Sequence, residues 1–82
     1  MTREDTGMKD LLAAIVRPLV GDPSAVVINQ FDQGHTIVLE LKVAADDMGK
    51  VIGKQGRRAQ AIRAIVKARA TRQGKRVIVD IV

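Results

Sequence analysis

The sequence contains no cysteine, a single histidine and a single aromatic residue, Phe31, among its 82 residues. Without cysteine there is no disulfide and no thiolate ligand for zinc, and His35 alone cannot form a histidine-rich metal site. No run approaches the roughly 20 consecutive apolar residues of a membrane-spanning helix. The polar opening, MTREDTGMKD, lacks the apolar core of a signal peptide. We therefore expect a cytoplasmic protein without membrane contact, cofactor or metal, built around aliphatic side chains.

Carboxylates are missing from a long part of the chain, and this absence divides the sequence by charge. Residues 1–47 carry four basic and eight acidic side chains, a net charge of −4, whereas residues 48–82 carry ten basic and one acidic, a net charge of +9. No Asp or Glu occurs between Met48 and Val79. Because solvated surfaces normally mix both signs, the pattern favours a polyanionic partner, with a merely soluble basic helix as the alternative.

Hydrophobic spacing predicts a helix over residues 8–20, MKDLLAAIVRPLV, capped by Asp5 or Thr6. Pro18 should loosen its last turn because proline lacks the backbone donor. Residues 21–24, Gly-Asp-Pro-Ser, should end the helix. Its apolar face consists of Leu11, Leu12, Ile15, Val16 and Leu19.

Two strands should follow this helix. Residues 25–31, AVVINQF, are rich in β-branched side chains, and Asp32-Gln33-Gly34 is typical of a hairpin turn. Residues 36–43, TIVLELKV, alternate between apolar and polar positions, which predicts a half-buried strand. The inward positions of this second strand are Ile37, Leu39, Leu41 and Val43.

The second half of the chain predicts two more helices and a final strand. Asp46 or Asp47 can cap a short helix that ends near Ile52. A longer helix over residues 57–72 should end at Gln73-Gly74, followed by a strand over 76–82. For the long helix we predict a buried face of Ile62, Ile65 and Val66, with small residues for close packing at Ala59, Ala61, Ala64, Ala68 and Ala70. In the final strand, Val77, Val79 and Ile81 share one face.

The order α-β-β-α-α-β predicts an α+β fold, in which three helices cover one face of a three-stranded mixed sheet. The length allows one domain, which we place at residues 8–82. Residues 1–7 are expected to form a flexible N-terminus.

The stretch KVIGKQGRR lies between the two later helices. Gly53 and Gly56 permit positive φ angles and a close backbone approach. The free N–H groups and positive dipole end of the next helix should point into this turn. With Lys54 and two arginines beside it, a phosphate group is the natural occupant. A plain helix-helix turn that needs two glycines is the alternative.

Other chemistries fit the sequence poorly. A P-loop needs Gly-x-x-x-x-Gly-Lys-Ser/Thr, which GKQGRRAQ lacks. The pair Asp46-Asp47 could suggest acid/base catalysis, but neighbouring residues on a helix point apart and no nucleophile is near. We therefore do not expect an enzyme.

The segment VIGKQGRRAQAI, from Val51 to Ile62, resembles the Val-Ile-Gly-x-x-Gly signature of KH domains, whose loop clamps about four nucleotides of backbone. The extra helix and strand before this core resemble the type II arrangement. From about Met8 onward, the chain is similar to the small single-KH proteins of bacteria called KhpA. The resemblance implies a non-catalytic single-stranded RNA-binding protein that acts as an RNA chaperone or post-transcriptional regulator.

The resemblance also implies which residues bind RNA. The Gly-Lys-Gln-Gly loop should contact the sugar-phosphate backbone, the next two arginines should reach adjacent phosphates, and three further cations should extend a basic track or lie on a solvated face. Val51 and Ile52, before the loop, are candidates for the wall of a base groove against the strand at 36–43, with core packing as an equal alternative for Ile52. In chain order the predicted set is Lys50, Val51, Ile52, Gly53, Lys54, Gln55, Gly56, Arg57, Arg58, Arg63 and Lys67.

One position departs from many KH domains. Ala59 stands where they carry a large aliphatic residue, three positions after the second glycine. We therefore expect weaker or less selective base contacts. The chain also lacks the aromatic platform on which RRM domains stack bases.

The resemblance implies partners as well as RNA. It suggests a homodimer, or a heterodimer with the larger KH-containing protein KhpB, and a role in cell shape and envelope growth. Two alternatives stay open. Single-stranded DNA could replace RNA as the ligand, or the chain could be a KH-fold dimerisation subunit with little RNA binding of its own.

Overall fold

The three strands form one sheet in the order β1-β2-β3 in the computed structural model, which describes residues 7–82. β1 (Val27–Gln33) pairs antiparallel with β2 (Thr36–Lys42), and β2 pairs parallel with β3 (Arg76–Ile81). The sheet is therefore mixed, and β2 is its central strand.

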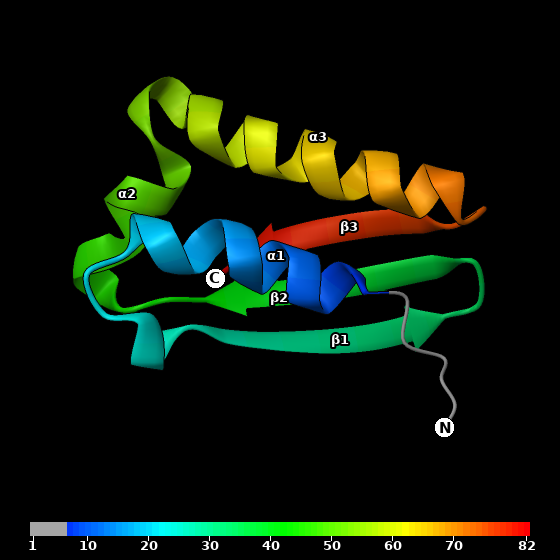
Figure 1. The fold of residues 1–82 in the computed structure, drawn as a ribbon, viewed down its shortest axis with the longest axis horizontal. Coiled ribbons are helices and arrows are strands. Elements are labelled where there is room, and N and C mark those ends of the chain that lie inside the picture. Colours follow the sequence, from blue (N-terminus) through cyan, green and yellow to red (C-terminus); the bar gives the residue numbers. More distant parts are fainter. Residues whose placement is uncertain (1–6) are drawn as a thin grey trace.

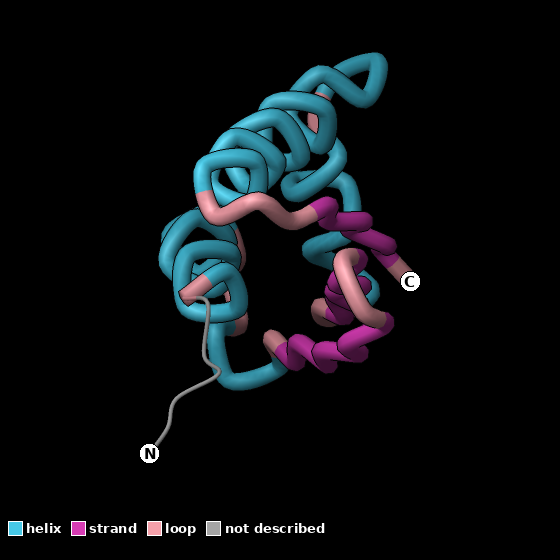
Figure 2. Tube along the Cα trace, turned by 90° about the vertical axis from the view of Figure 1, so that its right-hand side faces the viewer, coloured by secondary structure: helices cyan, strands magenta, loops and turns pink. Residues whose placement is uncertain are grey.

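The helices α1 (Met8–Val16), α2 (Met48–Ile52) and α3 (Arg57–Arg72) lie together on one side of the sheet. Figure 1 shows α3 running along β3 and α1 lying over the sheet. Figure 2, turned by 90°, shows the helices and the strands as two layers. The predicted α+β fold with a mixed three-stranded sheet and three helices on one face is confirmed.

The core lies between these two layers. Alternation along β2 turns Ile37, Leu39 and Leu41 toward the helices, and each is at most 1% exposed. From the helices, the residues of the core with at most 2% exposure are Met8, Leu12, Val16, Val51, Ile62, Val66 and Ala70. The sequence predicted the face of α1 correctly around Leu12 and Val16 but missed Met8, one turn earlier.

Proline shapes the end of the first helix as expected. The α-helical part stops at Val16, and residues Arg17–Leu19, with Pro18 inside, form a single 3-10 turn. A second 3-10 turn, Pro23–Ala25, precedes β1, so the strand begins at Val27 rather than at residue 25. The proposed caps Asp5 and Thr6, and the expected flexible segment apart from Gly7, lie outside the described residues.

The prediction of the hairpin turn was wrong by two residues. Gln33 pairs with Thr36, which leaves Gly34 and His35 as a two-residue turn. Gly34 has a φ of 68°, and such turns match the twist of the strands they join. Asp32, although typical of turns, is therefore part of the β1 ladder.

The length of α3 was predicted correctly, but its buried face is narrower than expected. Ile65 is 49% exposed, and the alanines at 61, 64 and 68 are exposed as well. The buried positions follow one line at spacings of three and four, at Ala59, Ile62, Val66 and Ala70. Ile65 lies beside this line, so the helix contacts the core along a single stripe.

We expect Ile62→Ala to lower the free energy of unfolding by about 2–5 kcal/mol, because it leaves a cavity beneath α3. Ile65→Ala, the same change on the same helix at a side chain that is 49% exposed, should cost less than about 1 kcal/mol. Urea denaturation followed by circular dichroism measures both. Equal losses would mean that Ile65 is buried as the sequence suggested. If Ile62→Ala does not fold, Ile62→Val can replace it in the comparison, with an expected loss of about 0.5–1.5 kcal/mol of unfolding free energy.

Candidate nucleic-acid interface

A sharp turn joins α2 to α3. After Ile52, Gly53 has φ 76° and ψ 178°, and the 3-10 turn Lys54–Gly56 follows. Gln55 has a φ of 57°, the one positive φ among the described residues that are not glycine, and Gly56 has a φ of 75°. The Gly56 amide donates to the Gly53 carbonyl at 3.2 Å, which closes the turn. Gln55 and Gly56 are thus two consecutive left-handed residues, a conformation that residues other than glycine rarely adopt.

The two glycines of the loop are required for different reasons. A Cβ on Gly53 would lie 2.6 Å from Arg58 Cβ and 3.1 Å from the Arg58 backbone nitrogen. A Cβ on Gly56 would meet nothing within 4 Å, so at this position only the left-handed φ favours glycine. Gly53 therefore determines how closely α2 approaches the first turn of α3.

The start of α3 opens onto this loop. Gly56 is its N-terminal cap and offers no side-chain acceptor, so the first N–H groups of α3 have no capping side chain. Lys54, Arg57 and Arg58 are exposed around this end. A shallow cleft of about 390 Å³ lies between them, lined by these three cations, Gly53 and Ala61. The helix dipole and three full charges make this cleft electropositive.

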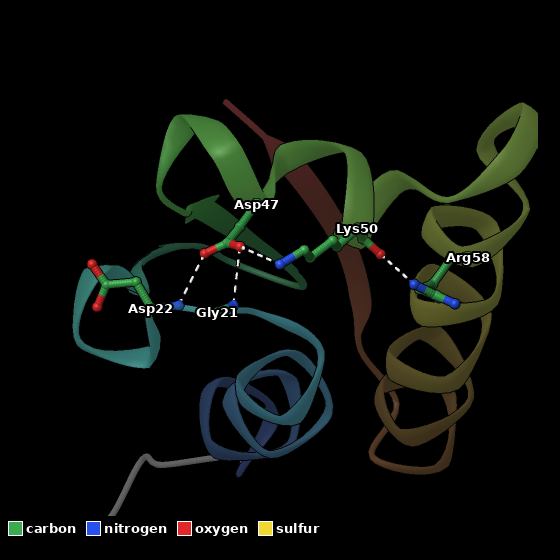
Figure 3. Close-up of polar contacts among 5 residues, drawn as sticks. All are labelled: Gly21, Asp22, Asp47, Lys50 and Arg58. Carbon is green, nitrogen blue, oxygen red and sulfur yellow. Dashed lines mark hydrogen bonds and ion pairs between the residues drawn. The ribbon is translucent and has the colours of Figure 1, made fainter.

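Arg58 and Lys50 join α3 to α2, as Figure 3 shows. The Arg58 guanidinium Nη1 donates to the Lys50 carbonyl oxygen at 2.6 Å. This bond satisfies a carbonyl in the last turn of α2, where no helical partner is available. A guanidinium has five N–H donors, so Arg58 keeps others for a ligand.

The Asp47 carboxylate anchors the other end of α2 (Figure 3). It accepts hydrogen bonds from the Gly21 amide at 3.0 Å and the Asp22 amide at 3.1 Å. Lys50 Nζ lies 3.3 Å from Asp47 Oδ1. Asp47 is only 3% exposed, and its side chain does not cap its own helix, contrary to one of the two predicted caps. The carboxylate instead fastens the segment after α1 to the start of α2.

These contacts change the acidity of Asp47. The hydrogen bond from the Gly21 amide lowers the pKa of the carboxyl, and the Asp22 amide and the Lys50 ammonium lower it further. Burial acts in the opposite direction, but the pKa stays below its ordinary value of 3.8. The folded structure therefore favours the charged carboxylate. This preference stabilises the protein at pH values above 3.8.

The other residues predicted to bind RNA lie in different parts of the structure. The prediction of Val51 as a wall of the base groove was wrong, because this side chain is fully buried in the core. Ile52 is half-buried. Lys50 is exposed but paired with Asp47. Arg63 Nε donates to the Val79 carbonyl oxygen of β3 at 3.2 Å. Lys67 borders a small cleft of about 170 Å³ together with Lys75 and Arg76.

The basic track expected along α3 is therefore divided into two groups of side chains, one at the loop and one beside β3. The cleft at the loop contains neither Arg63 nor Lys67, because these two residues lie along the side of α3 that borders β3. The sequence did not indicate that Ala61 would line the cleft, or that Arg58 would bond to α2. These roles depend on the turn of the loop, which brings Gly53 against Arg58.

The predicted position of the base groove needs correction. The sequence placed it against the strand at 36–43, but β2 is paired on both sides and its helix-facing side chains are buried. β3 is the edge strand beside α3 (Figure 1). The strand that packs beside α3 at the edge of the sheet is therefore β3, not β2.

Elsewhere, a larger groove of about 480 Å³ lies between α1 and β1 and includes none of the predicted RNA-binding residues. Within residues 7–82, no cluster of three or more His, Cys, Asp or Glu could bind a metal ion. In the same part of the chain, the helices are too short or too polar to cross a membrane.

Comparison with known proteins gives a family and several relatives. The family described as KhpA/KhpB, KH domain, matches residues 9–81. The RNA-binding protein KhpA of Caldanaerobacter subterraneus subsp. tengcongensis is 55% identical over 75 residues, which is 92% of this chain and 100% of the relative. The RNA-binding protein KhpA of Clostridium acetobutylicum is 52% identical over the same shares of both chains.

A solved structure has the same fold. It is the crystal structure of Era in complex with MgGDPNP and nucleotides 1506-1542 of 16S ribosomal RNA, with a TM-score of 0.66 and 15% identity. The match covers 98% of this chain and 30% of the Era chain. The likeness is therefore to a part of Era and concerns the fold alone.

We expect the two glycines of the loop to respond differently to alanine. Gly56→Ala should cost about 1–2 kcal/mol of unfolding free energy, the penalty for a left-handed residue with a Cβ. Gly53→Ala should cost more, because its Cβ would also displace Arg58. Urea denaturation measures both, and Gly56→Asn should recover part of the loss since asparagine tolerates this conformation. If Gly53→Ala cost no more unfolding free energy than Gly56→Ala, the close approach of Gly53 to Arg58 would be contradicted.

The lowered pKa of Asp47 predicts a pH-dependent effect. At neutral pH, Asp47→Asn should lower the urea midpoint, because the charged acceptor of two backbone amides is lost. Below pH 3.8, the parent protein should lose this stabilisation as the pH falls through the folded pKa, so the two midpoints should converge. Asp46→Asn, at the exposed neighbouring position, is the matched control and should have little effect. A difference between parent and Asp47→Asn that stays constant down to acid pH would contradict the assignment.

Proposed function

The chain belongs to the KhpA/KhpB family of KH domains, and on this basis we propose that it is a non-catalytic single-stranded RNA-binding protein. The observation that carries the proposal is the loop at Gly53–Gly56. Its left-handed backbone opens the N-terminus of α3, and Lys54, Arg57 and Arg58 surround that end with no carboxylate in the cleft. Such an end binds the phosphates of a nucleic acid backbone.

Each part of the loop has a distinct role in this proposal. The two glycines let the sugar-phosphate backbone approach, Lys54 neutralises a phosphate, and Gln55 donates a hydrogen bond. Arg57 and Arg58 bind adjacent phosphates at the start of α3. Because Arg58 is also bonded to the Lys50 carbonyl, its guanidinium is held in place before RNA arrives, which reduces the entropy lost on binding.

The more distant residues of the predicted set have lesser roles. Lys50, Arg63 and Lys67 add charge, although the first two also make contacts within the protein. Val51 supports the loop from the core, and Ile52 contributes apolar surface for a base. We place the bases beside β3, the edge strand next to α3. With Ala59 4% exposed and no aromatic platform, we expect weak base selectivity, since phosphate contacts carry no sequence information.

A single loop of this kind should bind RNA weakly, and useful affinity then requires a second RNA-binding domain held nearby. We propose that this chain acts as a homodimer or together with a KhpB-type protein, as an RNA chaperone or post-transcriptional regulator in the cytoplasm. By family resemblance, its role is in cell shape and envelope growth. The alternative is a dimerisation subunit with little RNA binding of its own.

The test is a salt titration of binding to a single-stranded RNA oligonucleotide. With three to five phosphates neutralised, log K against log salt should have a slope of about −2 to −3.5. Lys54→Ala/Arg57→Ala should weaken binding about tenfold or more and make the slope shallower by about 1.4, since two phosphate contacts are lost. Gly56→Asp should abolish binding while preserving the fold, because aspartate tolerates a left-handed φ and adds a negative charge to the clamp.

Arg69→Ala/Arg72→Ala is the matched control, because it also removes two positive charges, but from the far end of α3. Arg69 lies about 18 Å from Arg57 along α3, so this variant should retain most of the affinity. Equal loss in both double variants would show non-specific attraction and refute the loop assignment. A DNA oligonucleotide of the same sequence separates RNA from DNA as ligand, and no detectable binding to either would favour the dimerisation subunit.

A further inference from the structure

Arg63 lies on the side of α3 that faces β3, and the strand holds its guanidinium in place. Arg63 Nε donates to the Val79 carbonyl oxygen at 3.2 Å. One turn further along α3, Lys67 lines a small cleft with Val77 and Ile78 of the same strand. The guanidinium of Arg63 therefore bridges α3 and β3, where we place the bases. From this contact and the donors it leaves over, we infer that Arg63 selects the base at one nucleotide position and prefers guanine or cytosine to adenine or uracil.

The bond to Val79 lies at the free edge of β3. Within the described chain, β3 is the last strand of the sheet and has β2 on one side only. The Val82 amide donates to the Leu41 carbonyl of β2. Because the backbone groups of successive residues point to opposite sides of a strand, Val79, three residues earlier, directs its own groups away from β2. An edge of this kind is open to a ligand, and a base that approaches it meets the guanidinium of Arg63.

Most of the hydrogen-bonding capacity of Arg63 is available to such a base. A guanidinium has five N–H donors and no acceptor. The bond to Val79 uses the donor on Nε, and the donors on Nη1 and Nη2 remain. Among residues 7–82, no carboxylate forms an ion pair with Arg63. Because Nε is fixed, the direction of the other donors is set before RNA binds, which reduces the entropy lost on binding.

A rigid pair of donors discriminates between bases by their acceptors. Guanine has two acceptors, O6 and N7, side by side on one edge. Cytosine has O2 and N3 side by side on its Watson–Crick edge. Adenine places its N6 amino donor next to N7 and N1, and uracil has an N3–H donor between its two carbonyl oxygens. The bases of a single strand are unpaired and expose these edges. Arg63 can therefore form two neighbouring hydrogen bonds with guanine or cytosine and only one with adenine or uracil.

No aromatic side chain offers a competing way to bind bases at this place. Phe31 pairs with Val38, and Val38 pairs with Ile78, so these three side chains form one row across the sheet. The row is on the face opposite the helices, which lie together on the other side in Figure 2. A base beside α3 cannot stack on Phe31. Base discrimination there depends on hydrogen bonds, which is the contribution assigned to Arg63.

The inference rests on the proposed function, because RNA held at the loop is what brings a base to Arg63. Arg63 follows Gly56 by seven residues, which is about 10 Å along α3. A stacked strand advances about 3.4 Å per nucleotide, so about three nucleotides span this distance. The preference concerns one position only. It is therefore compatible with the weak selectivity expected for the RNA as a whole.

The test is fluorescence anisotropy of the full chain with four RNA strands of about eight nucleotides, the length of two four-nucleotide KH sites. One strand contains uridine alone, and the other three carry one central guanosine, cytidine or adenosine. Guanosine, cytidine or both should lower Kd about fivefold or more, as expected for one bidentate contact, whereas adenosine should change Kd less than about twofold. The analogues 7-deazaguanosine and 3-deazacytidine, which lack N7 and N3, should cancel the gain in their respective strands.

Arg63→Lys separates base selection from charge. Lysine keeps the positive charge but lacks the planar fork of donors. The variant should bind the uridine strand within about twofold of the parent, with the same salt slope, and should lose the preference for guanosine or cytidine. A purely structural role of Arg63 would instead change the affinity for all four strands alike.

Arg72→Lys is the matched control. It makes the same change on the same helix nine residues later, or two and a half turns, and so on the opposite side of α3. This variant should keep the preference of the parent. Circular dichroism verifies that both variants are folded. If Arg63→Lys is not, the two deaza analogues decide the matter with the parent protein alone.

The outcomes for this inference and for the loop are distinct. Equal Kd values for all four strands in the parent, or a preference that survives in Arg63→Lys, would overturn the role of Arg63 and leave the loop assignment standing. Loss of the preference in Arg72→Lys would also overturn it. If the parent bound none of the four strands, the proposed function would fail, and this inference would fail with it.

Discussion

The arrangement of α2, the loop and α3 depends on the approach of Gly53 to Arg58. Because no Cβ stands between them, the chain turns within a few residues and α3 begins with its first amides uncapped. The same turn brings the Arg58 guanidinium onto the Lys50 carbonyl and so satisfies the end of α2. A looser turn would separate the two helices and disperse the charges that now converge on one cleft.

The rest of the domain supports this turn from outside the loop. Val51 anchors α2 in the core, and Asp47 joins the start of α2 to the segment that follows α1. Both ends of a helix with only five residues are thus fixed by tertiary contacts, which a helix of this length needs because its own hydrogen bonds are few. The loop is presented by a short, well-tethered element.

The sequence predicted the fold and the loop well because both depend on local patterns. Alternation identified β2, helical spacing identified α3, and two glycines within a basic segment identified the turn. The errors arose where neighbours in space decide the outcome. Ile65 was assigned to the core because it fits a wide apolar stripe, yet α3 packs along a narrower one. Asp32 was assigned to a turn by its residue type, although pairing with Ile37 extends the strand past it.

By itself the sequence determined the order of the elements, the charge division between its halves and the need for positive φ at the loop, since these follow from residue type and spacing. Only the tertiary structure decided that Asp47 accepts a hydrogen bond from Gly21, that β2 is the central strand and β3 an edge strand, and that Phe31, Val38 and Ile78 form one row. The reason is that strand order and register join residues far apart in the chain, and no local pattern records which of them will meet.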